Sequence, residues 1–361
     1  MKRIYLAFLV LVAILAGCSS HIPKKRSLES FQRKSVCYDR SKEPYTPVVD
    51  SHLHYGAFDG HSLTFREMND YLRATTVRFA NVYGIGQMLP VGSKCSNYLT
   101  CPGVPVSPTT RNDFINADNI KNYNPSDLHL TLAMTFTNLA HPERTLEIMK
   151  QYDELYPDLF QWMGEVNLVK QNQFNNLHIP APKSAIRRWE GFMSELRKRS
   201  MPITIHSDIG NDTNPTKYLP LMEFALSLYP QNTIIWAHMG LSYEQLHLNA
   251  RQHIAILTDL LERYPNLMLD ISWRLLEDNY FSQLGNREQY VEFINRYSSR
   301  ILPGSDFVGF KDNTYSVYRS ELEATSRILA ELDDKAFRNI ALGANYFKLL
   351  KINFFAPEIC N

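Results

Sequence analysis

The feature that most constrains the fold of this chain is a regular alternation of short apolar runs with longer amphipathic stretches, which begins near residue 46. The short runs are rich in β-branched residues and predict strands. We place these strands at Thr46–Ser51, Val77–Val82, Leu128–Thr135, Phe160–Val166, Pro202–Ser207, Thr233–His238, Leu267–Ile271 and Arg300–Gly304. Strands that alternate with helices predict a parallel sheet, because each parallel connection must cross over the sheet.

The stretches between the strands have apolar residues at i, i+3 and i+4 with charged residues between them, which predicts helices. The predicted helices are Pro142–Leu155, Lys183–Arg199, Pro215–Tyr229, Tyr243–Tyr264, Arg287–Tyr297 and Ser316–Leu332. Tyr-Pro pairs at 156–157, 229–230 and 264–265 suit helix ends, because proline cannot continue a helix.

Polar residues at the strand ends distinguish a closed barrel from an open sheet. The residues in question are His52, His54, Glu165, His206, His238 and Asp306. They follow strands that are far apart in sequence, including the first and the eighth. Only a closed barrel brings all carboxyl ends to one rim. We therefore predict an α/β fold of the (β/α)8 TIM-barrel type, with one site at that rim.

The types of these residues indicate a metal centre. His52 and His54 are two positions apart, so on a strand their imidazoles point the same way. A single histidine at a strand end is more often a hydrogen-bonded packing residue. Five strands that end in His, Glu or Asp favour a divalent metal instead. His and carboxylate ligands accept Zn²⁺, Mn²⁺, Fe²⁺ or Co²⁺, and we expect Zn²⁺.

Several motifs together resemble the amidohydrolase superfamily of metal-dependent hydrolases, and its amidohydrolase-related branch in particular. The resemblance covers roughly residues 46 to 352. The matching motifs are Asp50-Ser51-His52-Leu53-His54, Gly164-Glu165-Val166, Ile205-His206, Ala237-His238-Met239-Gly240 and Gly304-Ser305-Asp306. The resemblance implies that His52, His54 and Asp306 bind a buried metal and that His206 is a further ligand.

Two residues have alternative roles under this resemblance. His238 is either a ligand of a second metal or a catalytic histidine. Glu165 either bridges two metals or supports a single one, and the full set of six side chains slightly favours two. Asp306 would orient the attacking water and accept its proton.

The resemblance implies an enzyme that hydrolyses an ester, lactone, amide or phosphoester of a small molecule with metal-activated water. One alternative is non-oxidative decarboxylation of an aromatic or unsaturated acid at a single metal. Another is a non-catalytic binding lipoprotein, which would be expected to have lost a ligand. Arg274 and Tyr83 could contact substrate, although a role at the rim suits them equally well. His61, His178, His247 and His253 follow no predicted strand, so we expect them at the surface.

The first residues resemble a bacterial lipoprotein signal. Lys2 and Arg3 precede an apolar run, Ile4–Ile14, that is too short to span a bilayer comfortably. Leu15-Ala16-Gly17-Cys18 then resembles the site at which such signals are cut before a lipidated cysteine. Ser19 suits lipoproteins sent to the outer membrane. We expect a signal peptide at 1–17, a lipidated tether at 18–45 and the barrel domain at 46–361.

Four cysteines remain after Cys18, and in an oxidising envelope an even number predicts disulfides rather than free thiols. We favour Cys95–Cys101 inside an irregular insertion at about 84–127, which leaves Cys37–Cys360 to join the two ends of the body. The net charge of +1 falls to −1 after cleavage, so nothing indicates a nucleic-acid partner. The expected partners are a small-molecule substrate and the membrane.

Overall fold

The computed structural model describes residues 25–33, 37–56, 62–95, 97–98 and 101–360. Its main sheet has nine strands in the order β10-β9-β8-β7-β6-β5-β2-β1-β11, and all pairs within it are parallel. The strands are β1 (Val49–His54), β2 (Phe79–Tyr83), β5 (His129–Met134), β6 (Phe160–Val169), β7 (Ile203–Ser207), β8 (Ile234–Trp236), β9 (Leu267–Asp270), β10 (Ile301–Leu302) and β11 (Phe307–Val308). Each predicted strand is present, with small differences at its ends.

The sheet closes through its last strand, which is interrupted. β10 pairs with β9, whereas β11 pairs with β1, so the two short strands are the two ends of one eighth strand. In the gap, Ser51 N donates to Pro303 O at 3.0 Å and Asp306 N donates to His52 O at 2.9 Å. The fold is therefore the predicted (β/α)8 barrel.

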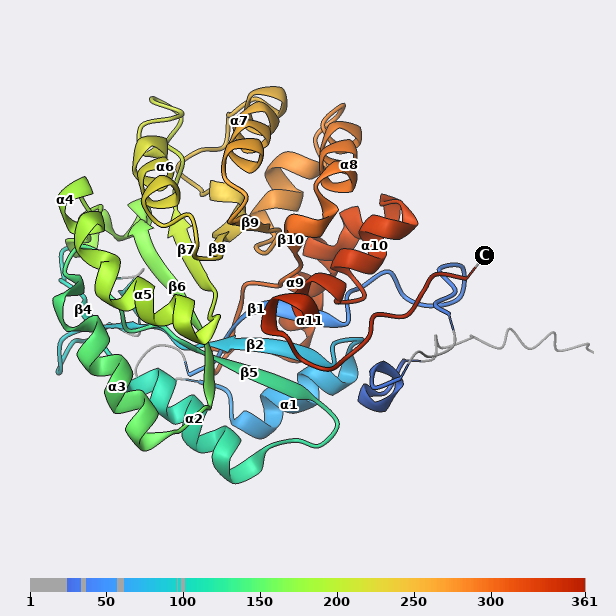
Figure 1. Ribbon diagram of the computed structural model, residues 1–361, viewed down its shortest axis with the longest axis horizontal. Coiled ribbons are helices and arrows are strands. Elements are labelled where there is room, and N and C mark those ends of the chain that lie inside the picture. The colour runs from blue at the N-terminus through green and yellow to red at the C-terminus, as the bar shows by residue number, and fades with distance from the viewer. Residues whose placement is uncertain (1–24, 34–36, 57–61, 96, 99–100, 361) are drawn as a thin grey trace, which may run out of the picture.

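Helices surround the strands on the outside of the barrel (Figure 1). They are α1 (Phe65–Ala74), α2 (Arg111–Tyr123), α3 (Thr145–Leu155), α4 (Lys183–Ile186), α5 (Glu190–Arg199), α6 (Leu219–Leu228), α7 (Ala250–Arg263), α8 (Arg287–Arg296), α9 (Tyr315–Ser326), α10 (Asp334–Ile340) and α11 (Ala344–Leu350). All six predicted helices are present, some of them split or shorter. The segment Asn339–Lys348, which resembles the final helix of the family, spans the end of α10 and most of α11. No helix was specified for the stretches that form α1 and α2.

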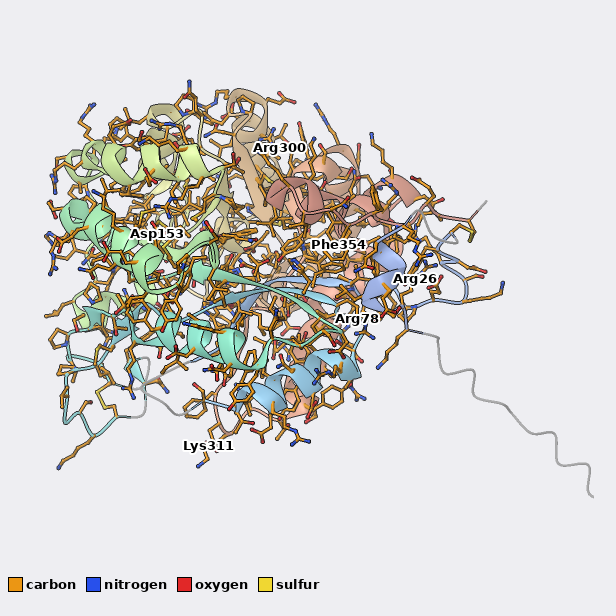
Figure 2. The ribbon with its side chains drawn as sticks, turned by 60° about the horizontal axis from the view of Figure 1, so that its bottom comes forward. Arg26, Arg78, Asp153, Arg300, Lys311 and Phe354 are labelled. Carbon is orange, nitrogen blue, oxygen red and sulfur yellow. A yellow bond between two sulfur atoms is a disulfide. The ribbon has the colours of Figure 1, made fainter. Side chains whose placement is uncertain are left out.

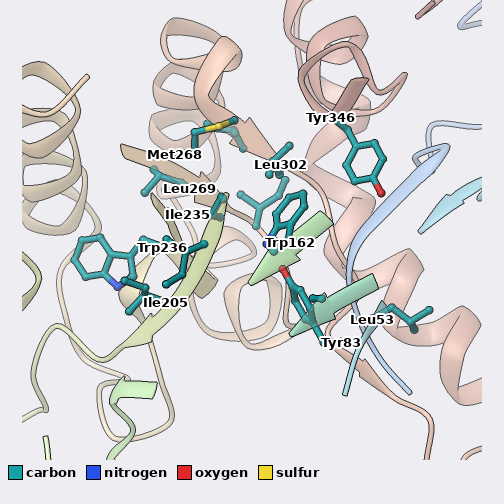
Figure 3. Close-up of a cluster of buried hydrophobic side chains, with 14 of the residues drawn as sticks. Leu53, Tyr83, Trp162, Ile205, Ile235, Trp236, Met268, Leu269, Leu302 and Tyr346 are labelled. Carbon is teal, nitrogen blue, oxygen red and sulfur yellow. The ribbon is translucent and has the colours of Figure 1, made fainter. Parts of the chain in front are cut away.

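Large side chains fill the interior of the barrel (Figure 3). The indole N–H of Trp162 donates to Thr204 Oγ1, and the hydroxyl of Tyr83 lies 2.8 Å from the same oxygen. From α11, the hydroxyl of Tyr346 bonds Thr131 Oγ1 at 2.9 Å. Because these side chains pack the barrel, a site can form only at its ends.

Within the segment that we expected to be a tether, residues 25–33 and 37–45 pack against the body of the protein. A short 3-10 helix, Leu28–Phe31, buries Phe31 completely, with its ring 5.3 Å from that of Phe79. Tyr38 forms a parallel bridge with Ile359. Two buried aromatic side chains, Phe31 and Tyr38, thus anchor residues before position 45 to the barrel.

The insertion after β2 is irregular only in its first half. It contains a small antiparallel pair, β3 (Gln87–Met88) with β4 (Ser107–Pro108), and then continues into α2. The structure forms both disulfides that we favoured, Cys95–Cys101 and Cys37–Cys360. The first pins this loop beside the carboxyl rim, and the second joins the two ends of the body.

Candidate metal centre

The carboxyl ends of the barrel strands surround a cavity of about 640 Å³. Five of the six residues that we proposed from sequence line it: His54, Glu165, His206, His238 and Asp306. His52 lies fully buried beneath them, with its ring 5.0 Å from that of His238. The structure therefore brings all six side chains to one place.

The rings of His52 and His54 converge with fixed orientations. The Nδ1 of His52 lies 2.8 Å from a carboxylate oxygen of Asp270, and the Nδ1 of His54 lies 2.9 Å from the carbonyl oxygen of Gly84. Both partners accept hydrogen bonds, so each Nδ1 carries the proton and each Nε2 presents a lone pair. The two Nε2 atoms are only 3.2 Å apart. Two facing lone pairs need a cation or a shared proton between them.

Asp306 completes this group. Its Oδ1 lies 3.5 Å from the Nε2 of both His52 and His54. The backbone of Asp306 has a φ of 54°, a left-handed conformation that costs energy outside glycine. The hydrogen bond from its N–H to His52 O holds it there. The three ligand atoms are close enough to hold one metal ion.

The charges around His54 favour a positive charge at this point. Burial alone would lower the pKa of His54, but the carboxylates of Asp306 and Glu165 raise it to about 10. Burial would likewise raise the pKa of Asp306, but the surrounding histidines, His238 first among them, lower it to about 2. The surroundings thus favour an ionised carboxylate beside a cation, and this donor set fits a divalent metal.

Glu165 lies between the two sides of the centre. Its carboxylate is 3.5 Å from His54 Nε2, 3.7 Å from His238 Nε2 and 2.5 Å from His206 Nδ1. Together with His52 and His238 it forms a second group of potential ligands. The preceding Gly164 has a φ of 103°, and a Cβ there would lie 2.2 Å from Thr204 O. A glycine is therefore needed where β6 approaches β7 so closely.

His238 also presents Nε2 to the cavity. The hydroxyl of Ser272 donates to Asp270, so it accepts from the Nδ1 of His238 at 2.9 Å. This leaves the lone pair of His238 on Nε2, facing Glu165. His206 differs, because carboxylates occupy both of its ring nitrogens: Glu165 at Nδ1 and Asp208, at 3.0 Å, at Nε2.

Three charged residues that contact the candidate ligands were not anticipated: Lys170, Asp208 and Asp270. The Nζ of Lys170 lies 3.3 Å from both carboxylate oxygens of Glu165. Burial would lower the pKa of Lys170, but Glu165 and its other neighbours outweigh this effect and raise it. One signal was available for Asp270, because it ends an apolar strand with a carboxylate as Glu165 and Asp306 do.

The weaker sequence predictions have different outcomes. Arg274 lines the cavity, but its guanidinium is bound to Asp278 at 2.8 Å and Glu321 at 3.2 Å. Tyr83 does not line the cavity, because its hydroxyl points into the barrel towards Thr204.

The histidines that we expected at the surface also differ from one another. His247 is exposed, but His178 lines the cavity and His253 is fully buried against Tyr290. These last two expectations were wrong, because loops and helices also supply inward-facing side chains. His61 lies outside the described residues.

Two family models match the sequence. Residues 166–343 match the amidohydrolase family, and residues 1–19 match the prokaryotic membrane lipoprotein lipid attachment site. Among the described residues, no helix is both long enough and apolar enough to cross a membrane. The chain therefore carries the attachment signal of a lipid-anchored envelope protein.

Solved structures of low sequence identity share the fold. A zinc-bound amidohydrolase of Burkholderia multivorans has a TM-score of 0.52 at 9% identity, covering 84% of this chain and 99% of its own. A dihydroorotase of Campylobacter jejuni has a TM-score of 0.50 at 13% identity, covering 85% and 84%. A protein of Pseudomonas putida described as a 2-pyrone-4,6-dicarboxylic acid hydrolase also has a TM-score of 0.50 at 13% identity, covering 85% and 98%.

Comparison with curated proteins gives no match. The likeness to the amidohydrolase family rests on the model that matches residues 166–343. The solved structures show that the chain shares the barrel fold of amidohydrolases.

Proposed function

We propose that this protein is a metal-dependent hydrolase that cleaves an ester, lactone, amide or phosphoester bond of a small molecule at the carboxyl rim. The observation that carries this proposal is the pair of Nε2 atoms of His52 and His54, which lie 3.2 Å apart with lone pairs facing. Packing alone would not favour this arrangement, because the two lone pairs repel each other. A divalent ion bound between them, which we expect to be Zn²⁺, would remove this repulsion.

His52, His54 and Asp306 would hold the first ion, and Glu165 with His238 would form a second position beside it. His206 would join this second position only by giving up its hydrogen bond to Glu165 or Asp208. When bound, such an ion supplies Lewis acidity and lowers the pKa of its water towards roughly 7. Asp306 would orient the attacking water, accept its proton and pass that proton to the leaving group.

His238 has two possible roles in this proposal. As a ligand it would use the Nε2 lone pair that its hydrogen bond to Ser272 leaves free. As a catalytic residue it would stabilise the oxyanion, which requires a proton on the same atom. The fixed tautomer favours the ligand role.

Glu165 decides between one ion and two. If it bridges two ions, Glu165→Gln lowers the metal content from two ions per chain to one and abolishes hydrolysis. If Glu165→Gln keeps full metal content and activity, a single-metal reaction such as decarboxylation of an aromatic or unsaturated acid becomes the better proposal.

We further propose that Cys18 is the lipidated residue and that the protein is anchored in the outer membrane, as Ser19 suggests. The match to the lipoprotein attachment site supports the anchor. More than one acyl chain on Cys18 would hold the protein stably at the membrane.

Elemental analysis of the purified protein tests the metal centre, and a panel of ester, lactone, amide and phosphoester substrates then tests activity before and after chelation. We expect stoichiometric metal and a hydrolytic activity that chelation removes and metal restores. His52→Ala should lose both. His247→Ala is the matched control, because that exposed histidine pairs with Asp212 away from the cavity. Metal-free protein whose activity is indifferent to chelators would refute the proposal.

A further inference from the structure

The N-terminal segment packs on the face of the barrel opposite the metal centre, where the strands begin. The buried ring of Phe31 contacts Phe79 at the start of β2 and Phe347 of α11. Lys25, the first described residue, donates a hydrogen bond to the carbonyl of Ala74, at the end of α1. The chain therefore enters the folded body at the amino-terminal face.

The length of chain before this point limits how far the barrel can lie from its anchor. Only six residues lie between Cys18 and Lys25, so the two are seven residue steps apart. Fully extended, these steps reach at most about 25 Å. A lipid on Cys18 therefore keeps the point where the chain enters the amino-terminal face within about 25 Å of the membrane.

The same face has a basic cavity of about 400 Å³ among the starts of β7, β8, β9 and β10 and the end of α11. Arg197, Arg300, Lys348 and Lys351 line it, and no Asp or Glu is among its lining residues. Arg197 is paired with Glu190. The other three form no ion pair within the part of the chain that the structure describes.

The groups that accept hydrogen bonds from these cations are uncharged, so they do not neutralise the positive charge. Arg300 donates only to the carbonyls of Leu267 and Tyr264, and Lys351 donates to Ser200 Oγ at 2.8 Å. Most other arginines in the described residues pair with a carboxylate. A hollow with three uncompensated cations suits a phosphate group.

The basic cavity and the entry point of the chain meet at α11. Phe347 packs on Phe31, Lys348 follows on the same helix, and Lys351 comes directly after the helix ends. Phe355, which follows this helix, is 41% exposed and donates its N–H to Phe31 O at 2.7 Å. In Figure 2, Phe354 lies near Arg26 and Arg78 at this end of the molecule, and Lys311 lies apart from them.

We propose that the amino-terminal face is a membrane-docking surface, in which Arg300, Lys348 and Lys351 bind the phosphate of a phospholipid headgroup and Phe355 enters the interface. Basic residues near an anionic leaflet and aromatic residues at headgroup depth both stabilise such contact. Docking would hold the metal centre away from the bilayer in one orientation, rather than leaving the barrel to turn about its anchor. This proposal is independent of the hydrolase proposal.

Vesicle binding of the mature chain without its lipid tests this surface. Residues 18–361 carrying Cys18→Ser are sedimented with vesicles of phosphatidylethanolamine and phosphatidylglycerol, or of phosphatidylcholine alone. The protein should bind the anionic vesicles and not the neutral ones. Lys348→Gln/Lys351→Gln should weaken binding about fivefold per lysine, or about twenty-fivefold in total. Phe355→Ser should weaken it further.

The matched control is Lys150→Gln/Lys311→Gln, which removes the same charge from exposed lysines elsewhere and should bind like the parent. Equal weakening in both double variants would show a general charge effect and overturn the docking surface. Titration with inorganic phosphate separates the two sources of the ligand. If inorganic phosphate binds and the anionic vesicles do not, the cavity is a site for a free anion and the membrane proposal fails.

Discussion

At the scale of single residues, the carboxylate of Asp270 connects both sides of the metal centre. One oxygen accepts from His52 Nδ1 at 2.8 Å, and the other accepts from the backbone N–H of His238 at 2.8 Å and from Ser272 Oγ at 2.6 Å. Burial would raise its pKa, but His52 and the other partners lower it, so the carboxylate stays ionised. It thereby fixes the tautomer of one histidine directly and of the other through Ser272.

Asp270→Asn should therefore weaken metal binding although it touches no proposed ligand atom. An amide in this place can no longer accept from all three donors. Losing such an outer partner typically costs 10- to 100-fold in metal affinity. A competitive titration with a chelating dye measures the change. Asp278→Asn, which removes a carboxylate bound to Arg274, is the control and should leave the affinity unchanged. Equal affinities in both variants would contradict this role of Asp270.

The sequence pattern predicted the side chains that the structure brings together at the candidate metal centre, but not the side chains behind them. His52, His54 and Asp306 could be predicted because each ends an apolar strand and so points from the barrel rim. Asp270 bonds His52 across 218 positions of sequence, and Lys170 lies beyond the end of its strand. Those contacts depend on the register between strands, which no local pattern specifies.

At the scale of elements, α2 was not predicted because its inner face is polar. Asn112, Asp113 and Asn116 are buried on it, and the two asparagines donate to the carbonyls of Ile85 and Tyr55 beside the cavity. An amphipathic pattern assumes that buried positions are apolar. Here the polar face of the helix instead donates hydrogen bonds to backbone carbonyls of the loops beside the cavity.

Asp113 makes this polar face sensitive to pH. Its carboxylate accepts from Thr135 N, Thr135 Oγ1 and Tyr152 OH, each at 2.7 Å. Burial outweighs these bonds and raises its pKa from 3.8 to about 6. The folded state therefore binds this proton more tightly than the unfolded state. The stability that Asp113 contributes is full below about pH 4 and falls by about 3 kcal/mol as the pH rises past 6.

Asp113→Asn should remove this dependence, because the amide can keep all three bonds if the Thr135 hydroxyl rotates. Urea unfolding at pH 4 and at pH 7 gives the two free energies of unfolding. We subtract the free energy of unfolding of the parent from that of the variant at each pH. This difference should be larger at pH 7 than at pH 4 by about 3 kcal/mol. Asp118→Asn, at an exposed position of the same helix, is the control. A parent-to-variant difference that is the same at both pH values would show that burial does not hold this proton.

At the scale of the whole molecule, the two ends of the body are joined by contacts that no stretch of sequence reveals. Phe31 stands in a basic, polar segment, and its partner Phe347 lies near the other end of the chain. Composition therefore suggested a solvated tether. The even number of cysteines was the one signal that tied this region to the C-terminus, through Cys37 and Cys360.

The two disulfides should differ in what they stabilise. Cys37–Cys360 spans 323 positions, whereas Cys95–Cys101 spans six. Because a longer closed loop restricts the unfolded chain more, Cys37→Ala/Cys360→Ala should lower the free energy of unfolding by about 2–5 kcal/mol, and Cys95→Ala/Cys101→Ala by less. Urea unfolding of both variants measures this order. The shorter bridge lies in the loop beside the cavity. Its loss should therefore raise KM clearly while changing the free energy of unfolding only slightly. If the shorter bridge cost more stability than the longer one, the N-terminal segment would be held to the barrel by the packing of Phe31 rather than by the bridge between the chain ends.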